Sequence, residues 1–204
     1  MGRPRRGALR LAIVGAESTG KTVLARALAE RLAPLTGLRC AWVGEWLREW
    51  CEREQRTPRA DEQRVIAQRQ QELIDAAAAQ CDVLVCDTTA LMTAVYSAML
   101  FDDPSLVPYA VREQRRCHLT LLTALDLPWV ADGLQRDGPH VRQPVDERLR
   151  ALLATHRLPW SLVAGQGEQR VDSALRAVAP LLARPAACAA PALAQRPVAG
   201  RARR

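Results

Sequence analysis

An eight-residue segment near the start of the chain has the residue types and spacing of a phosphate-binding loop, G-x-x-x-x-G-K-[ST]. Glycine at both ends permits a tight turn in which successive backbone N–H groups point at phosphate oxygens. The lysine supplies a compact charge for the terminal phosphates, and the last hydroxyl is a ligand for magnesium. That lysine is the only one in a chain whose other basic side chains are arginines. The pattern predicts that ATP or GTP binds with Mg²⁺ at Gly15, Ala16, Glu17, Ser18, Thr19, Gly20, Lys21 and Thr22.

A carboxylate, Asp87, follows the short apolar run 83–86. At the carboxyl end of a buried strand, it is placed to hold magnesium opposite Thr22. The same group is also a candidate base for the proton of an attacking hydroxyl. The alternative is a structural role, because Asp87, Thr88 and Thr89 are all residue types that cap a following helix. Thr89 is the better candidate for that cap.

The segment 42–50, WVGEWLREW, offers side chains to a second substrate. Glu45 follows a predicted strand, where it would meet the phosphoryl acceptor; the alternative is an ordinary first-turn glutamate that favours the helix dipole. Arg48 is either a substrate contact or a salt-bridge partner. Trp46 and Trp50, one turn apart, fit a core position better than a stacking surface.

The polar connection at residues 126–144 is predicted to be a mobile lid. Its glycines permit hinging, and Arg136 and Arg142 would bring positive charge onto the transferring phosphates. The alternative is a solvated surface loop. Trp129 is a candidate stacking platform, and the turn 164–167 either borders an adenine or is a plain turn.

Strands that alternate with helices must position these groups. Apolar runs predict strands at 9–15, 39–43, 82–87, 118–124 and 160–164, and helical periodicity predicts helices at 21–33, 45–53, 58–80, 89–100, 145–156 and 168–183, with a further short helix after a loop at 101–108. The first helix is expected to bury Val23, Leu24, Leu28 and Leu32 and to be broken by Pro34 and Gly37. This order favours a parallel sheet covered on both faces, with ligands beyond the carboxyl ends of its strands.

Length and charge limit the remaining possibilities. The chain has 204 residues, 49% hydrophobic and 25% charged, which suits one folded domain. The net charge of +7 comes from arginines near the two ends, so the body is near −2 and is no strongly basic nucleic-acid platform. We expect a basic arm at 1–8, a folded P-loop domain at 9–183 and a disordered tail at 184–204. No secretory or membrane-spanning segment is seen, which predicts a cytoplasmic protein with reduced, mostly buried cysteines.

Four segments, taken in order, resemble the ribosylnicotinamide kinase domain of NadR-type proteins. These are LAIVGAESTGKT at 11–22, EWLRE at 45–49, DTT at 87–89 and WVADGLQR at 129–136, within a resemblance that spans about residues 9–183. The resemblance implies an α/β P-loop NTPase fold, with a five-stranded parallel sheet of order 2-3-1-4-5 and helices on both faces. It also implies transfer of the terminal phosphoryl group of ATP to the 5′-hydroxyl of nicotinamide riboside, giving nicotinamide mononucleotide and ADP.

The same resemblance assigns roles to single residues. It implies that Thr22 and Asp87 hold Mg²⁺, that the acceptor is bound by Glu45, Arg48, Trp129 and Asp132, and that catalysis involves Lys21, Asp87, Glu45 and Arg136. Fuller members carry an adenylyltransferase domain, and sometimes a helix-turn-helix, ahead of the kinase. Here the first predicted strand begins near residue 9, so we expect neither adenylyl transfer nor DNA-binding repression. Two alternatives stay open: another nucleoside or nucleotide kinase, or a regulatory P-loop ATPase with no small-molecule acceptor. The oligomeric state stays open as well.

Overall fold

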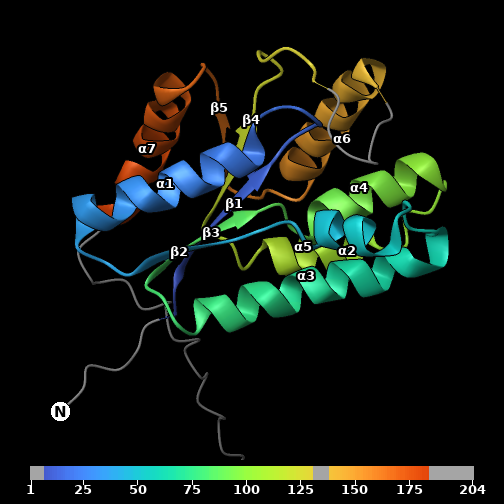
Figure 1. Ribbon diagram of the computed structural model, residues 1–204, viewed down its shortest axis with the longest axis horizontal. Helices are drawn as coiled ribbons and strands as arrows, with labels where there is room; N and C mark the ends of the chain where they lie inside the picture. Colours follow the sequence, from blue (N-terminus) through green and yellow to red (C-terminus); the bar gives the residue numbers. More distant parts are fainter. Residues whose placement is uncertain (1–6, 131–137, 184–204) are drawn as a thin grey trace, which may run out of the picture.

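Five short strands form one parallel sheet in the order β2-β3-β1-β4-β5 (Figure 1), which confirms the expected fold class. The computed structural model describes residues 7–130 and 138–183. Each strand is joined to the next by at least one helix, as parallel pairing requires. The strands are β1 Leu9–Val14, β2 Cys40–Val43, β3 Val83–Asp87, β4 Leu119–Thr123 and β5 Trp160–Val163.

Helices cover both faces of the sheet, because alternate strand side chains point to opposite sides. On one side, Leu11 and Ile13 pack with α1 and α7; on the other, Val14 and Leu122 pack with α4, α5 and α6. The helices are α1 Lys21–Thr36, α2 Trp46–Glu54, α3 Gln63–Ala78, α4 Ala90–Leu100, α5 Val107–Gln114, α6 Arg142–Thr155 and α7 Glu168–Leu182, with short 3₁₀ turns at Ala60–Glu62 and Pro139–Val141. Within the described ranges, no helix is long and apolar enough to cross a membrane.

Two predictions for the first helix were wrong. Val23 is 74% exposed, because the buried stripe of α1 runs through Leu24, Leu28 and Leu32 and position 23 lies about 100° away from Leu24 around the helix. Pro34 does not break α1, which continues to Thr36. A proline in the last turn removes one backbone donor, and the packed helix tolerates that loss. The helix ends at Gly37, whose φ of 67° lets its N–H bond the carbonyl of Ala33.

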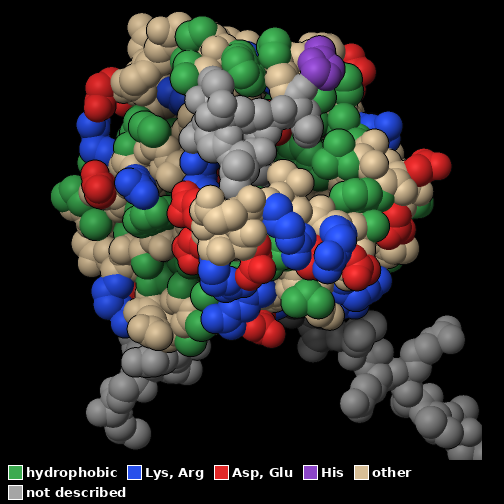
Figure 2. Space-filling view, turned by 45° about the vertical axis from the view of Figure 1, so that its right-hand side comes forward, with side chains coloured by type: hydrophobic (Ala, Val, Ile, Leu, Met, Phe, Trp, Pro, Cys, Tyr) green, Lys and Arg blue, Asp and Glu red, His purple; other side chains and the backbone are tan. Residues whose placement is uncertain are grey.

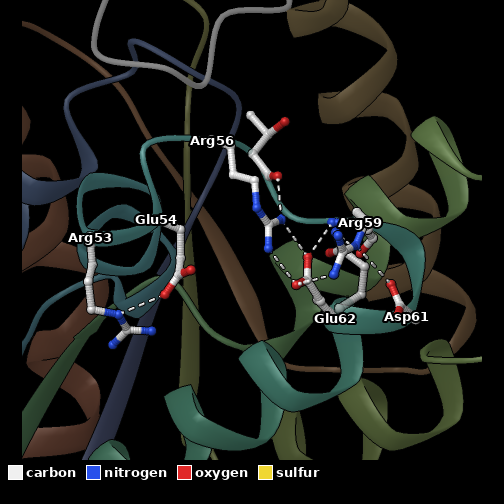
Figure 3. Close-up of polar contacts among 8 residues, drawn as sticks. Arg53, Glu54, Arg56, Arg59, Asp61 and Glu62 are labelled. Carbon is white, nitrogen blue, oxygen red and sulfur yellow. Dashed lines mark hydrogen bonds and ion pairs between the residues drawn. The ribbon is translucent and has the colours of Figure 1, made fainter.

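The helix predicted from residue 58 begins later, at Gln63, because charged side chains organise the turn before it (Figure 3). Arg56 donates two hydrogen bonds of 2.7 Å to the Glu62 carboxylate, which also accepts the backbone N–H of Arg59 at 2.8 Å. The Arg56 bonds, followed by the Arg59 N–H, lower the pKa of Glu62 to about 2. This turn therefore stays locked between α2 and α3 at any ordinary pH.

Charges of both signs are interleaved on the face shown in Figure 2, with arginines next to acidic side chains. The five cysteines in the described part of the chain are free thiols, and four of them are buried. They fill the core, as predicted. Residues 1–6 of the predicted arm, the tail at 184–204 and residues 131–137 lie outside the described residues.

Candidate functional site

The phosphate loop joins β1 to α1, and its shape depends on close packing against β4. A Cβ atom at position 15 would overlap the Thr123 hydroxyl, so only glycine fits there. The Thr123 hydroxyl donates to Thr19 Oγ1 at 2.7 Å, and Thr19 Oγ1 donates to the carbonyl of Ala16 at 2.8 Å. Gly20, with φ of 75°, caps the start of α1. The loop is therefore preformed, with the amino end of α1 behind it, as phosphate binding requires.

Lys21 lies across this loop. Its ammonium donates a hydrogen bond of 2.9 Å to the carbonyl of Ala16, and its side chain is only partly buried. The charge is thus held within the loop, where a terminal phosphate would be placed. A compact ammonium with three donors can keep such a bond and still reach an anion.

Asp87 ends β3, directly beside Ile13 of β1. It is 0% exposed, and neither of its carboxylate oxygens has a hydrogen-bond partner among the described residues. Burial raises the pKa of Asp87, and the nearby Thr22 hydroxyl and the charge of Lys21 oppose that rise. A buried carboxylate next to a hydroxyl is the hard oxygen donor set that Mg²⁺ accepts, with phosphate oxygens completing its shell.

The structure also shows that Thr89, and not Asp87, caps the following helix. Thr89 is the N-cap of α4, and its hydroxyl accepts the N–H of Leu91 at 3.3 Å, as predicted. The same hydroxyl donates to the amide oxygen of Gln114 at 2.7 Å. Because Thr89 caps the helix, the Asp87 carboxylate is not needed for that purpose.

Glu45 lies at the carboxyl end of β2, which is the strand next to β3. It is the N-cap of α2, one residue before the helix begins, yet its side chain makes no capping hydrogen bond. Arg48 is exposed on α2, and its positive charge acts to lower the pKa of Asp87. The structure therefore brings Glu45 and Arg48 to the same end of the sheet as the phosphate loop.

Arginines cover most of the tryptophans. Trp46 and Trp50 belong to a buried cluster with Ile66, and guanidinium carbons lie 5.4 and 5.6 Å from the Trp46 ring and 4.8 Å from the Trp50 ring. Trp50 is a core residue, as favoured, and Trp46 is half-buried against the same cluster. Trp129 is half-buried, and no arginine of the described ranges is stacked on it.

Residues 126–130 and 138–144 of the predicted lid are described. The Ser18 hydroxyl donates to the carbonyl of Val130 at 2.6 Å, which ties this segment to the phosphate loop. Arg142 is not a swinging lid residue: it begins α6, is 9% exposed and donates to the carbonyl of Leu127 at 2.9 Å. Asp132 and Arg136 lie outside the described residues.

Sequence reasoning missed three polar side chains that organise this end of the sheet. Gln70 of α3 bonds the backbone on both sides of Glu45. Arg170 is buried, forms a salt bridge with Asp126 and donates to the carbonyl of Gly165 at 2.9 Å. Asp126 in turn accepts the N–H of Gly165 at 2.6 Å, which fixes the turn after β5. For Gln70 a signal did exist, since it occupies the apolar face of α3 between Ile66 and Ile74.

A family model described as "AAA domain" matches residues 10–170 of the chain. Among curated proteins, none matches the sequence. Solved structures share its fold. The NadR protein in complex with NAD and AMP-PNP is 20% identical with a TM-score of 0.70, and 90% of this chain covers 52% of that one. The NadR protein in complex with NR is 22% identical with a TM-score of 0.65, and 85% of this chain covers 51% of that one.

A thymidylate kinase from Ehrlichia chaffeensis has the same fold over its whole length. It is 15% identical with a TM-score of 0.58, and 86% of this chain covers 100% of that one. The chain thus spans about half the length of the NadR structures and the full length of a nucleotide kinase. At these identities the likeness shows the fold, which is the P-loop fold of nucleoside and nucleotide kinases.

Proposed function

The chain belongs to the AAA domain family, and from this premise we propose that residues 9–183 form an ATP-dependent kinase for a small nucleoside. Nicotinamide riboside is the first candidate acceptor, with transfer to its 5′-hydroxyl. The buried carboxylate of Asp87, unpartnered within the described residues and close to Thr22 and Lys21, is the observation that carries the proposal. A bare phosphate-binding loop explains nucleotide binding, whereas this carboxylate provides for the metal that phosphoryl transfer uses.

On the donor side, Thr22 and Asp87 would hold Mg²⁺, which supplies positive charge to the phosphates when it is bound. Residues 15–20 present backbone N–H groups to the phosphates, and the Lys21 ammonium turns from the Ala16 carbonyl to the terminal phosphate. Phosphoryl transfer depends on positioning and charge neutralisation more than on covalent chemistry by the protein. A preformed loop of this kind serves both requirements.

On the acceptor side, Glu45 would orient the 5′-hydroxyl and Trp129 would stack on the base. A cationic nicotinamide ring gains about 0.5–2 kcal/mol from an aromatic face, depending on how far it is desolvated. Trp46 and Trp50 do not take this role, because arginines already lie over their rings. Arg48 and the residues Asp132 and Arg136 keep their proposed acceptor and lid roles.

A nucleoside monophosphate is the second candidate acceptor. The charges of Arg48 and Arg26 both act on Asp87, so positive charge lies near the acceptor side and would suit a phosphate. Thymidylate kinase, which shares the fold, is named for such a substrate. The two candidates differ in whether the acceptor already carries a phosphate.

One assay distinguishes these readings. ADP release should be measured with nicotinamide riboside, thymidine, adenosine, cytidine and deoxynucleoside monophosphates at equal concentration. Turnover with nicotinamide riboside supports the first candidate, and turnover on monophosphates alone assigns a nucleotide kinase. Slow ATP hydrolysis that no acceptor stimulates would refute the proposal and indicate a regulatory ATPase.

A further inference from the structure

We propose that Gln70 is a positioning residue that holds the Glu45 carboxylate toward the acceptor. The inference rests on the proposed acceptor role of Glu45 and names the side chain that orients Glu45. Gln70 lies on α3, 25 residues away in the chain from Glu45. Its side-chain amide contacts the backbone on both sides of that residue.

The contacts use both the oxygen and the nitrogen of the Gln70 side-chain amide. The Gln70 Oε1 atom accepts the backbone N–H of Trp46 at 2.7 Å, and the Gln70 Nε2 atom donates to the carbonyl of Gly44 at 3.1 Å. Glu45 is the residue between these two bonds. Its backbone is thus held at two adjacent peptide groups by one rigid planar group.

The first of these bonds satisfies a backbone N–H group at the start of α2. The first N–H groups of a helix have no partner inside it and are normally satisfied by the side chain of the N-cap residue. Glu45 occupies the N-cap position of α2 but makes no capping bond. The Glu45 side chain is thus not used to cap α2, and Gln70 anchors the first residue of that helix, Trp46, from the neighbouring helix α3.

The amide itself has little freedom to move. Gln70 is 3% exposed, and its neighbours one turn away on α3, Ile66 and Ile74, are 2% and 1% exposed. Ile66 packs against Trp50 of α2, so α2 and α3 are joined by an apolar contact beside the polar one. A buried amide with both ends bonded specifies one backbone position, whereas an apolar side chain there would allow several.

A double-mutant cycle tests this inference. Gln70→Met keeps the volume and removes both bonds, Gln70→Asn keeps an amide that is too short to span them, and Glu45→Gln removes the carboxylate. Each is measured alone, and the Gln70 variants are also combined with Glu45→Gln. The readouts are kcat/KM for the acceptor, KM for ATP and the melting temperature. Gln71→Met is the matched control, because Gln71 is a buried glutamine on the same helix that bonds Asp75.

We expect either Gln70 variant to lower kcat/KM for the acceptor by about 10- to 100-fold, since small misplacements cost that much. KM for ATP should stay within about twofold, and Gln71→Met should leave kcat/KM for the acceptor within about threefold. In the Glu45→Gln background the Gln70 effect should shrink to within about twofold, because the group that Gln70 positions is gone.

An undiminished Gln70 effect in that background would overturn the inference, and so would an equal loss in Gln71→Met. Failure of the proposed function has a different signature. If the wild-type protein phosphorylates no nucleoside, the kinase assignment falls. If Glu45→Gln alone has full activity, the acceptor role of Glu45 falls, and the inference about Gln70 with it.

Discussion

Replacing Asp87 by asparagine should stabilise the ligand-free protein while it removes phosphoryl transfer. The ordinary expectation for a buried residue is the opposite, since most core substitutions destabilise. Here the carboxylate is fully buried, and neither oxygen has a hydrogen bond within the described residues. Asparagine has almost the same shape and carries no charge. The substitution therefore removes a cost that, under the proposed function, the folded protein bears in order to bind Mg²⁺.

The size of the gain follows from the environment of the carboxylate. Leaving a buried polar group unsatisfied costs about 1–3 kcal/mol, and a charged group costs more than a neutral amide. The free energy of unfolding should accordingly rise by roughly 1–3 kcal/mol. For a chain of this length, each kcal/mol raises the melting temperature by about 2–4 °C.

The gain must also depend on pH. Burial raises the pKa of Asp87 in the folded state above its ordinary 3.8. Above that raised pKa the charge lowers the stability of the wild type, and this loss disappears as the pH falls and the folded state takes up the proton. The advantage of Asp87→Asn should thus be largest near pH 8 and shrink as the medium becomes acidic.

The assay is thermal and urea denaturation of both proteins with a chelator present, followed by the same measurement with MgATP. MgATP should stabilise the wild type more than the variant, because the variant lacks a metal ligand. Asp75→Asn is the control of opposite sign: burial acts to raise the pKa of Asp75, but hydrogen bonds from Arg116 and Arg10 outweigh it and the pKa is lowered. That substitution should destabilise. A less stable Asp87→Asn protein, or a difference independent of pH, would refute the reasoning.

Substitutions at three further residues test the other parts of the site. Lys21→Ala should cost about 2–4 kcal/mol of transition-state stabilisation in kcat/KM, and Lys21→Arg should not restore it, because a planar fork does not replace a compact ammonium; an active arginine variant would contradict this. Trp129→Ala should raise KM for the acceptor more than KM for ATP in steady-state kinetics, and equal changes would indicate a structural role. Arg170→Met should lower the free energy of unfolding by roughly 1–3 kcal/mol. This loss is smaller than that for a fully buried ion pair, because Asp126 keeps solvent contact. The variant should also raise KM for ATP, and an unchanged KM would show that the turn after β5 does not border the nucleotide.

Some features could be predicted from residues that are close together in the chain. The phosphate loop is one continuous segment whose glycines and lysine act through local backbone geometry. The strands were recognisable as short apolar runs, and Thr89 as a cap from its type and place. Predictions went wrong where the local pattern was ambiguous, at Val23 and at Pro34, because packing against the sheet decides which residues are buried and where a helix ends.

Sequence alone determined the phosphate loop, the alternation of strands and helices, and the presence of Glu45 just after β2 and of Asp87 at the end of β3. Only the tertiary structure decided that Asp87 is buried without a partner among the described residues, that arginines cover Trp46 and Trp50, and that Gln70 spans the backbone around Glu45. The physical reason is the distance along the chain over which each kind of interaction acts. Turn geometry and periodicity act between residues a few positions apart, whereas desolvation and hydrogen bonds between elements depend on which segments the sheet brings side by side.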